Sequence, residues 1–301
     1  MKTTTTTKMK TTATTTMKTT TPTRFGTGPR QLGLSAALAL VTLSVLPASA
    51  ATVTLTATDD ATILGLLAND NYGAYHVNPA GGIGGDSQVS VMRFDVGALN
   101  GLYSSIDSIT LRLYYFNDAG VDGGAGAGVE PVTANVHAIS AANRAWVEGV
   151  SQGGAATGES TWNNLAHSST PWAGSAGLGT VGTDYDSTVL ATYSLPGPWV
   201  DRPADGTVID FTFSGTSAAL TTLINTWMVD NVDNSQANPG LLLRDPTPSN
   251  VGGRNRFTAH SNENGNAALN PQLIVNYTVP EPSSVLLLGL GGLAMFRRRR
   301  G

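Results

Sequence analysis

Acidic side chains in close pairs are the residues of this sequence whose spacing first suggests ion binding. Asp59-Asp60 and Asp184-x-Asp186 each place two carboxylates within a few residues of one another. Calcium takes roughly six to eight hard oxygen ligands, which carboxylates, amide groups and carbonyls can supply. We therefore consider a structural calcium ion at these four residues, although the function predicted below requires no cofactor. The alternative, that these acids are solvated and keep the protein soluble, stays open.

Tryptophan side chains are the second group with a clear chemical use. Sugars present apolar C–H faces, so an exposed aromatic ring binds them by stacking while polar neighbours contact the hydroxyl groups. Trp172 and Trp199 lie in Pro- and Gly-rich segments, and we predict that they are glycan platforms. Trp227 lies on the apolar face of a predicted helix and is expected in the core. For any single tryptophan, the alternative is a core position.

Catalytic motifs are absent from the sequence. It contains no cysteine, no His-Glu-x-x-His, no Gly-x-Ser-x-Gly and no phosphate-binding loop. Glu148 and Glu159 can be imagined as a glycosidase pair, and a lyase could use a histidine such as His167 as its base. The Gly-rich segment between the two glutamates does not favour such a pair, and we predict a protein that is not an enzyme.

The segments that would position these side chains are mostly strands. Apolar and polar residues alternate or have strand-like composition in Ala51–Ala57, Val89–Val96, Ser108–Phe116, Val132–Ile139, Val208–Phe213, Leu241–Leu243, Phe257–His260 and Leu273–Tyr277. Ser217–Val229 differs, because its apolar residues are spaced as one face of a helix, with Ser217 as the N-cap. We predict an all-β fold, a single β-sandwich or jelly roll with one short helix.

Charge is divided unevenly along the chain. All four lysines lie within the first 18 residues, and four arginines, Arg297–Arg300, stand near the other end. Residues 51–280 hold seven arginines, no lysine and 20 acids, which gives a net charge of −13. A segment with this negative charge is repelled by DNA, RNA and anionic lipid. We therefore expect no nucleic-acid partner.

The N-terminal segment is typical of an export signal. Residues 1–23 include 14 threonines, a low-complexity composition to which we assign no structure. Arg24 and Arg30 then precede the short apolar run Leu32–Leu46, and Pro47-Ala48-Ser49-Ala50 follows with a small-x-small pattern. These are the three parts of a secretory signal peptide. We predict cleavage after Ala50.

The C-terminal segment combines three features in a fixed order. Pro280-Glu281-Pro282 leads into the apolar stretch Ser283–Phe296, and Arg297, Arg298, Arg299 and Arg300 follow. A helix of that stretch reaches only about 21 Å, less than a hydrocarbon core of roughly 30 Å. We therefore expect a short hydrophobic helix that holds the inner membrane transiently, with its arginines in the cytoplasm.

These three features resemble the PEP-CTERM sorting signal of Gram-negative bacteria. The resemblance covers only the last part of the chain. It implies an exosortase as partner, removal of the tail, and release to the cell surface or the extracellular matrix.

The body resembles a second family, the DNRLRE-type domain. The motifs that carry the resemblance occur in this order: Asp59-Asp60, Asn71-Tyr72-Gly73, Val91–Val96, Ile106–Tyr115, Trp146-Val147-Glu148, Ser160–Asn163, Pro171-Trp172-Ala173, the predicted helix ending at Trp227, Gly240–Arg244 and Pro271–Val275. Ser108 or Ile109 stands where that family has an alanine, and Gly120–Gly128 is a long insertion. The resemblance implies a β-sandwich related to a carbohydrate-binding module, a polysaccharide partner outside the cell, and no catalytic set.

Three segments are therefore predicted: a low-complexity lead and signal peptide at 1–50, a body at 51–278, and a sorting signal at 279–301. Translation starts at Met1 or at Met17. We expect an exported protein that reaches the cell surface or a biofilm matrix and associates there with exopolysaccharide. Two alternatives stay open: a secreted polysaccharide-cleaving enzyme, either lyase or glycosidase, and a purely structural surface protein.

Overall fold

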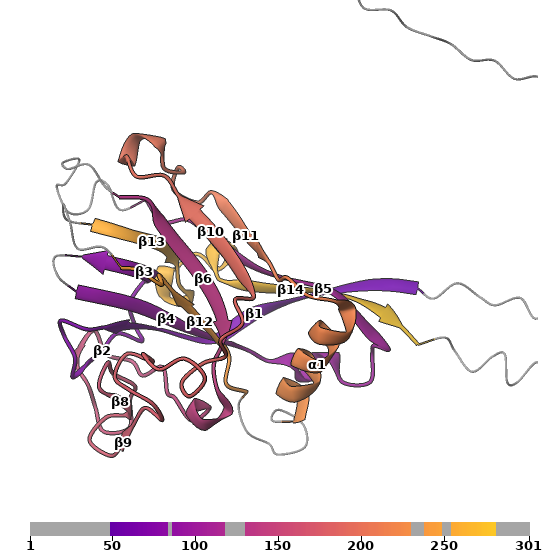
Figure 1. Cartoon of the computed structure of the whole chain (residues 1–301), viewed down its shortest axis with the longest axis horizontal. Coiled ribbons are helices and arrows are strands. Elements are labelled where there is room, and N and C mark those ends of the chain that lie inside the picture. Colours follow the sequence, from indigo (N-terminus) through magenta and orange to yellow (C-terminus); the bar gives the residue numbers. More distant parts are fainter. Residues whose placement is uncertain (1–48, 84–85, 118–129, 230–237, 249–253, 281–301) are drawn as a thin grey trace, which may run out of the picture. The chain divides into compact units, whose positions relative to one another are not determined.

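The computed structural model describes residues 49–83, 86–117, 130–229, 238–248 and 254–280. These residues form antiparallel sheets with one α-helix among them, which confirms that the body is mostly β (Figure 1). The predicted signal peptide as far as Ala48 and the predicted C-terminal helix lie outside the described residues. Within the described ranges, no helix is long and apolar enough to cross a membrane.

The largest sheet contains ten strands. They are β1 (Ser49–Leu64), β3 (Val77–Ile83), β4 (Asp86–Phe94), β5 (Ser105–Tyr114), β6 (Val132–Ala138), β10 (Ala191–Leu195), β11 (Val208–Thr212), β12 (Leu241–Arg244), β13 (Arg254–His260) and β14 (Gln272–Val279). Two short pairs lie beside it, formed by β2 (Asp70–Asn71) with β7 (Gly153–Gly154) and by β8 (Asn164–Ala166) with β9 (Thr170–Pro171). The helix is α1 (Ser217–Met228).

The long strand β1 connects the two halves of this sheet. As far as Thr56 it pairs with β14, and from Ala57 onward it pairs with β4. The register shifts between Ala57 and Asp59, as at a β-bulge, where a strand bends and twists more strongly. From β14 the sheet continues to β5 and β11, and from β4 it continues to β12, β6 and β10. The bend in β1 therefore turns one antiparallel sheet into two facing halves.

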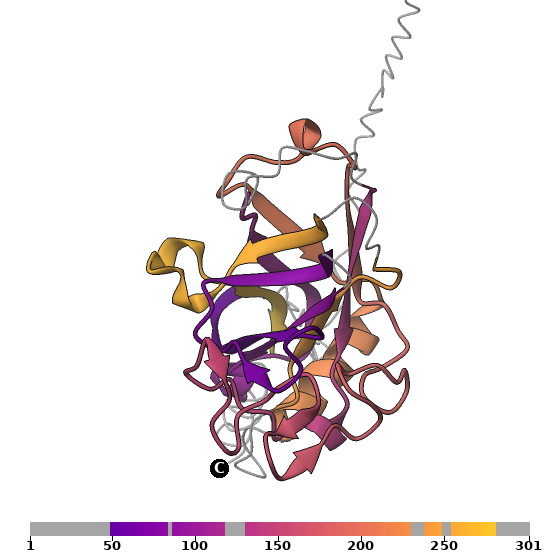
Figure 2. The ribbon, with the colours of Figure 1, turned by 90° about the vertical axis from the view of Figure 1, so that its left-hand side faces the viewer.

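The sheet curls until it is nearly closed. β3 pairs with both β4 and β13, and β13 reaches the end of β5 through a bridge between Ala259 and Tyr115. The amide of Phe116 also donates to the carbonyl of Thr258 at 2.9 Å. Figure 2 shows the resulting ring of indigo and yellow strands. The body is thus barrel-like, and its strand order does not by itself establish the jelly roll that the sequence suggested.

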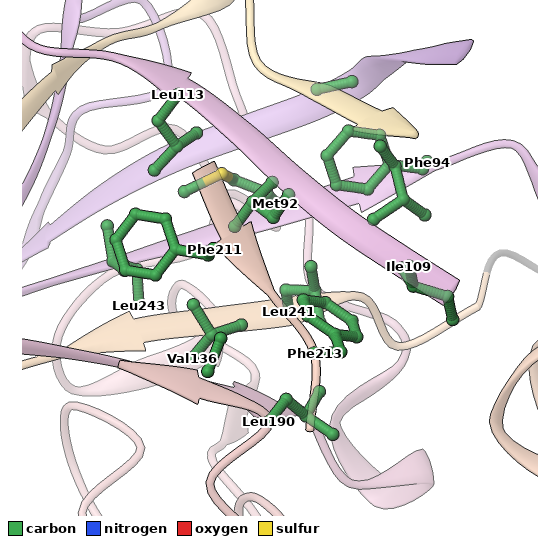
Figure 3. Packing of buried hydrophobic residues seen from close by; sticks show 14 of the residues in the cluster. Met92, Phe94, Ile109, Leu113, Val136, Leu190, Phe211, Phe213, Leu241 and Leu243 are labelled. Carbon is green, nitrogen blue, oxygen red and sulfur yellow. The ribbon is translucent and has the colours of Figure 1, made fainter. Parts of the chain in front are cut away.

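The main hydrophobic core fills the space between the two halves. Figure 3 shows how side chains from β4, β5, β6, β11 and β12 converge, among them Met92, Phe94, Leu113, Phe211 and Leu243. Each of these five side chains is almost wholly buried. Because burial of such a side chain contributes about 1.5–3 kcal/mol, this cluster is the main source of the free energy that holds the barrel together.

A second cluster covers the outer face of the β4 half. It is built by residues 139–190, the long segment between β6 and β10, whose side chains Trp146, Trp172 and Leu178 pack against Val89 and Val91 of β4. For this reason β4 is buried along both faces. The candidate functional residues lie mainly in this segment and along the strand that it covers.

The helix α1 packs on β5 beside the main core. It begins one residue after its N-cap, Thr216, whose hydroxyl accepts from the amide of Ala219. The predicted N-cap, Ser217, is instead the first helical residue, and its hydroxyl donates to the carbonyl of Ile106 on β5. Leu220 and Trp227 are buried as the spacing predicted, so the helix prediction is confirmed apart from its exact ends.

Candidate acidic site and aromatic row

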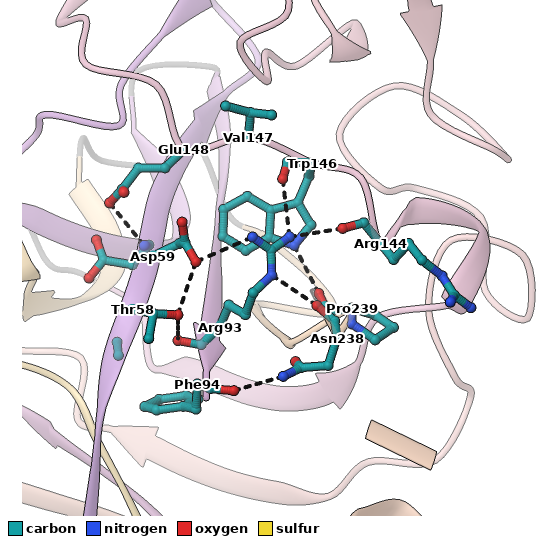
Figure 4. Close-up of polar contacts among 12 residues, drawn as sticks. Thr58, Asp59, Arg93, Phe94, Arg144, Trp146, Val147, Glu148, Asn238 and Pro239 are labelled. Carbon is teal, nitrogen blue, oxygen red and sulfur yellow. Dashed lines mark hydrogen bonds and ion pairs between the residues drawn. The ribbon is translucent and has the colours of Figure 1, made fainter. Parts of the chain in front are cut away.

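Arg93 fixes the position of the segment that carries Glu148 (Figure 4). From β4, its guanidinium donates to the carbonyls of Asn238 (2.9 Å), Arg144 (2.9 Å) and Trp146 (3.1 Å). It also contacts the carboxylate of Asp59 at 3.3 Å and lies 4.1 Å from the ring centre of Trp146. A planar group with several donors suits such a junction. The segment after Trp146 is thereby held against the bulged part of β1.

Three carboxylates meet next to this junction. Asp60 of β1, Glu148 after Trp146, and Glu263 of the short 3-10 helix η6 (Asn262–Asn264) each place an oxygen so that all three lie within 4.8 Å of one another. The amide of Asp60 donates to Glu148 Oε1 at 3.0 Å, and the amide of Asn262 donates to Asp60 Oδ2 at 2.9 Å. Asp60 is 1% exposed, Glu148 is half-buried and Glu263 is exposed. The group is therefore closed at Asp60 and open to solvent at Glu263.

The charges of this acidic group are poorly compensated. Burial, followed by the repulsion of Glu263 and Glu148, raises the pKa of Asp60 well above its ordinary value. Burial, with repulsion from Glu263 and Asp59, raises the pKa of Glu148 to about 8. Burial raises the pKa of Glu263 as well. Without a cation, these groups are stabilised by taking up protons.

Two asparagines adjoin the same carboxylates, Asn78 through its side chain and Asn262 through its backbone amide. Asn78 of β3 is 0% exposed and lies beside Asp60, where it lowers the pKa of that carboxyl. The oxygen of the Asn78 amide has no hydrogen-bond partner within the described residues, and the same holds for Asn262 Oδ1. Buried polar atoms without partners are uncommon in folded proteins. Their concentration around Asp60 marks this as an incompletely satisfied polar site.

The second predicted acidic pair does not join this group. The Asp184 carboxylate accepts from the amides of Gly174, Ser175 and Thr180 and from the Asn143 side chain. It therefore organises the loop around itself. Asp186 is exposed and borders a cavity of about 570 Å³ between α1 and the segment before β10. The sequence suggested one calcium site from four aspartates, and the structure separates Asp59 and Asp60 from Asp184 and Asp186.

The tryptophan predictions meet different outcomes. Trp172 is 3% exposed, packs in the second cluster and donates from its indole nitrogen to the carbonyl of Thr161 at 2.9 Å. The prediction that it offers an exposed platform is wrong, because its ring is used as core. Trp199 begins the 3-10 helix η4 (Trp199–Asp201), and its side chain lies outside what the structure describes. Trp227 is buried, as predicted.

Half-exposed aromatic rings gather elsewhere, in a group that the sequence did not indicate. The rings of Tyr72, Tyr75, His76 and Phe116 follow one another edge to face, with centroid separations of 5.8, 4.8 and 5.6 Å. We call these four side chains the aromatic row; each keeps part of its surface in solvent. Ser261 supports the row, because its amide and hydroxyl donate to the carbonyls of His76 and Tyr75. Ser261 also precedes the acidic group's Glu263 by two residues.

The residues considered for catalysis belong to separate networks. The carboxylate of Glu159 accepts from the amides of Val150 and Ala156 and from the hydroxyl of Ser151. Burial opposes its charged form, yet these bonds outweigh that effect and lower the pKa of Glu159. Glu148 instead contacts Asp60. The carboxylate of Glu159 is thus engaged within its own loop, whereas that of Glu148 belongs to the acidic group.

Comparison with known proteins identifies the C-terminal segment. Residues 278–300 match the PEP-CTERM protein-sorting motif, which confirms the sorting signal predicted from Pro280-Glu281-Pro282 and the terminal arginines. The motif implies export, processing by an exosortase at the membrane, and a destination at the cell surface. No curated protein matches the chain. The match does not extend over the body, whose DNRLRE-type resemblance stays a prediction.

Proposed function

We propose that this chain is an exosortase-sorted surface or matrix protein whose body binds exopolysaccharide without cleaving it. The match over residues 278–300 supports the sorting half of the proposal. The observation that carries the binding half is the aromatic row. Four half-exposed rings in succession give a chain of sugar units several apolar contacts, which is how proteins hold the C–H faces of glycans.

The net negative charge of the chain favours a neutral glycan over an acidic one. Residues 51–280 carry a net charge of −13, and such a surface repels an acidic polysaccharide unless cations lie between the two. Stacking on rings requires no charge on the sugar. We therefore assign the row to a neutral exopolysaccharide, with a uronate polymer as the unfavoured class.

Affinity electrophoresis of the purified full chain tests this assignment. Gels containing dextran, galactomannan or alginate should retard the protein on at least one of the two neutral glycans. Tyr75→Ala should weaken that retention by roughly 2- to 13-fold, because one stacked ring contributes about 0.5–1.5 kcal/mol beyond its buried area. Tyr103→Ala is the matched control, since Tyr103 is half-exposed but hydrogen-bonds to Asn225 of α1, away from the row.

Several outcomes would contradict the proposal. Equal retention of Tyr75→Ala, Tyr103→Ala and the unchanged chain would remove the row from binding. Absence of retention on any glycan, with self-association of the protein, would favour the purely structural alternative. Release of reducing ends or unsaturated uronates, lost on Glu148→Gln or His167→Ala, would favour the enzyme.

A further inference from the structure

We propose that Asp60, Glu148 and Glu263 bind a calcium ion, with the amide oxygens of Asn78 and Asn262 as further ligands. The site is independent of the glycan proposal, because it rests on a different set of side chains. It also differs from the calcium site suggested by the sequence, since it retains only Asp60 of the four aspartates.

The spacing of the three carboxylates fits one ion. Calcium binds oxygen at about 2.3–2.6 Å, so two ligands on opposite sides of the ion are roughly 5 Å apart. The three carboxylate oxygens lie within 4.8 Å of one another, although their residues are 88 and 115 positions apart along the chain. Three carboxylates at this distance repel one another, and a divalent cation between them turns that repulsion into attraction.

The unpartnered amide oxygen of Asn78 is the observation that separates this group from an ordinary acidic patch. This amide comes from β3, carries no charge, and is fully buried beside Asp60 with its oxygen free. An amide oxygen is a common calcium ligand. A bound ion would satisfy Asn78 Oδ1, which has no hydrogen-bond partner within the described residues.

The chemical type of the candidate ligands indicates which metal ion the site binds. Every candidate donor is an oxygen, without a histidine or cysteine among them, and hard oxygen sites suit calcium or magnesium rather than zinc or copper. Magnesium demands an almost ideal octahedron, whereas calcium accepts irregular geometry. Donors from a strand, a loop and a 3-10 helix form an irregular set. The open side at Glu263 gives the ion a route in and leaves room for water ligands.

Calcium at this position would connect three parts of the fold. Asp60 belongs to β1, Glu148 to the segment of the second cluster, and Glu263 to the turn between β13 and β14. An ion held only by the folded arrangement stabilises the native state by mass action. The calcium-dependent stability of the whole body is therefore the quantity to measure.

The test uses the full chain, purified with detergent and stripped of metal with EGTA at pH 7. Equilibrium dialysis should show one calcium ion bound per chain, and saturating calcium should raise the melting temperature by roughly 5 °C. Glu263→Gln should weaken calcium binding at least about tenfold and remove most of this rise. Because Glu263 is exposed, its amide variant is expected to fold. Glu130→Gln is the matched control, since Glu130 is also exposed and is not part of the acidic group.

Four results would overturn the proposal. The first is no calcium bound at millimolar concentration. The second is equal calcium affinity of Glu263→Gln and the unchanged chain. The third is equal loss of affinity in Glu130→Gln, which would indicate nonspecific attraction to the acidic body. The fourth is magnesium bound as tightly as calcium, which would remove the assignment of the ion. None of these readouts involves polysaccharide, so failure here and failure of the glycan proposal are distinguishable.

Discussion

The guanidinium of Arg93 joins chain segments that are far apart in the sequence. It satisfies the carbonyls of Arg144, Trp146 and Asn238 and pairs with Asp59, while only 7% of its residue surface is exposed. The position of Glu148 in the acidic group therefore depends on a residue that carries no part of the candidate chemistry. Single side chains of this kind set the geometry of the site.

Arg93→Lys should destabilise the protein by roughly 3 kcal/mol or more. Lysine keeps the charge but loses the fork of donors, so buried carbonyls are left without partners. Arg112→Lys is the matched control: Arg112 makes two 2.8 Å bonds to Asp210, but on a half-exposed surface, where the expected cost is under about 1 kcal/mol. Urea unfolding of both variants measures the difference. Equal midpoints would show that the buried junction contributes nothing specific.

The sequence identified Asp59 and Asp60 as an interesting pair but could not identify their partners. Adjacency along the chain is visible in a sequence, whereas the approach of Glu148 and Glu263 depends on how a loop and a turn fold back onto β1. The same reason explains the error at Trp172. Its Pro- and Gly-rich surroundings indicate a loop, and only the packing shows that this loop turns the ring inward.

At the scale of elements, alternation predicted the longer strands with one apolar face well. β5 and β14 show this pattern and were predicted closely. β3 was missed because Pro79, Gly81 and Gly82 interrupt any apolar pattern. β10 was missed although Ala191–Leu195 alternates between apolar and polar residues, because a run of five residues is a weak signal. The second cluster could not be predicted at all, since the segment 139–190 has little regular structure and is held together by packing and loop hydrogen bonds.

Gly240→Ala should disrupt the start of β12 and lower the free energy of unfolding by roughly 3 kcal/mol. Gly240 has φ +83°, and a Cβ added there would overlap the carbonyl oxygen of Met92 on β4, so strain and overlap add. Gly265→Ala is the control, since φ is +79° but a Cβ would meet no atom within 4 Å. Gly265→Ala should lower the free energy of unfolding by about 1 kcal/mol, from backbone strain alone. Thermal unfolding of the two variants separates the contributions, and equal losses would exclude the overlap as a cause.

At the scale of the whole molecule, the predicted terminal signals and the body have different tasks. The tail carries the matched sorting motif, while the described residues contain the core, the acidic group and the aromatic row. Composition and short motifs were sufficient to predict the tail because recognition there depends on local sequence. The activity of the body depends on tertiary arrangement, so its sequence indicated a class of fold and little about the site.

Replacing Pro280-Glu281-Pro282 by three alanines should keep the chain in the inner membrane fraction of the producing cell. The unchanged chain should be released with a mass that corresponds to cleavage after Ala50 and loss of the tail. Glu130→Ala provides the control for loss of an exposed acid. Fractionation followed by intact-mass measurement reads out both cuts. Normal release of the triple-alanine variant would show that this tripeptide is not what the processing enzyme recognises.

The first strand of the sheet pairs with the last, so the residues on either side of the predicted signal-peptide cut lie opposite the start of the sorting motif. Ser49 and Ala50 pair with Val279 and Thr278, so the predicted cleavage after Ala50 would remove those partners along with the leader. Thr278 retains Ser105 of β5, whereas Val279 then has no neighbour in the ladder described here. Removal of the leader would thus leave Val279, the residue just before Pro280, without a partner strand.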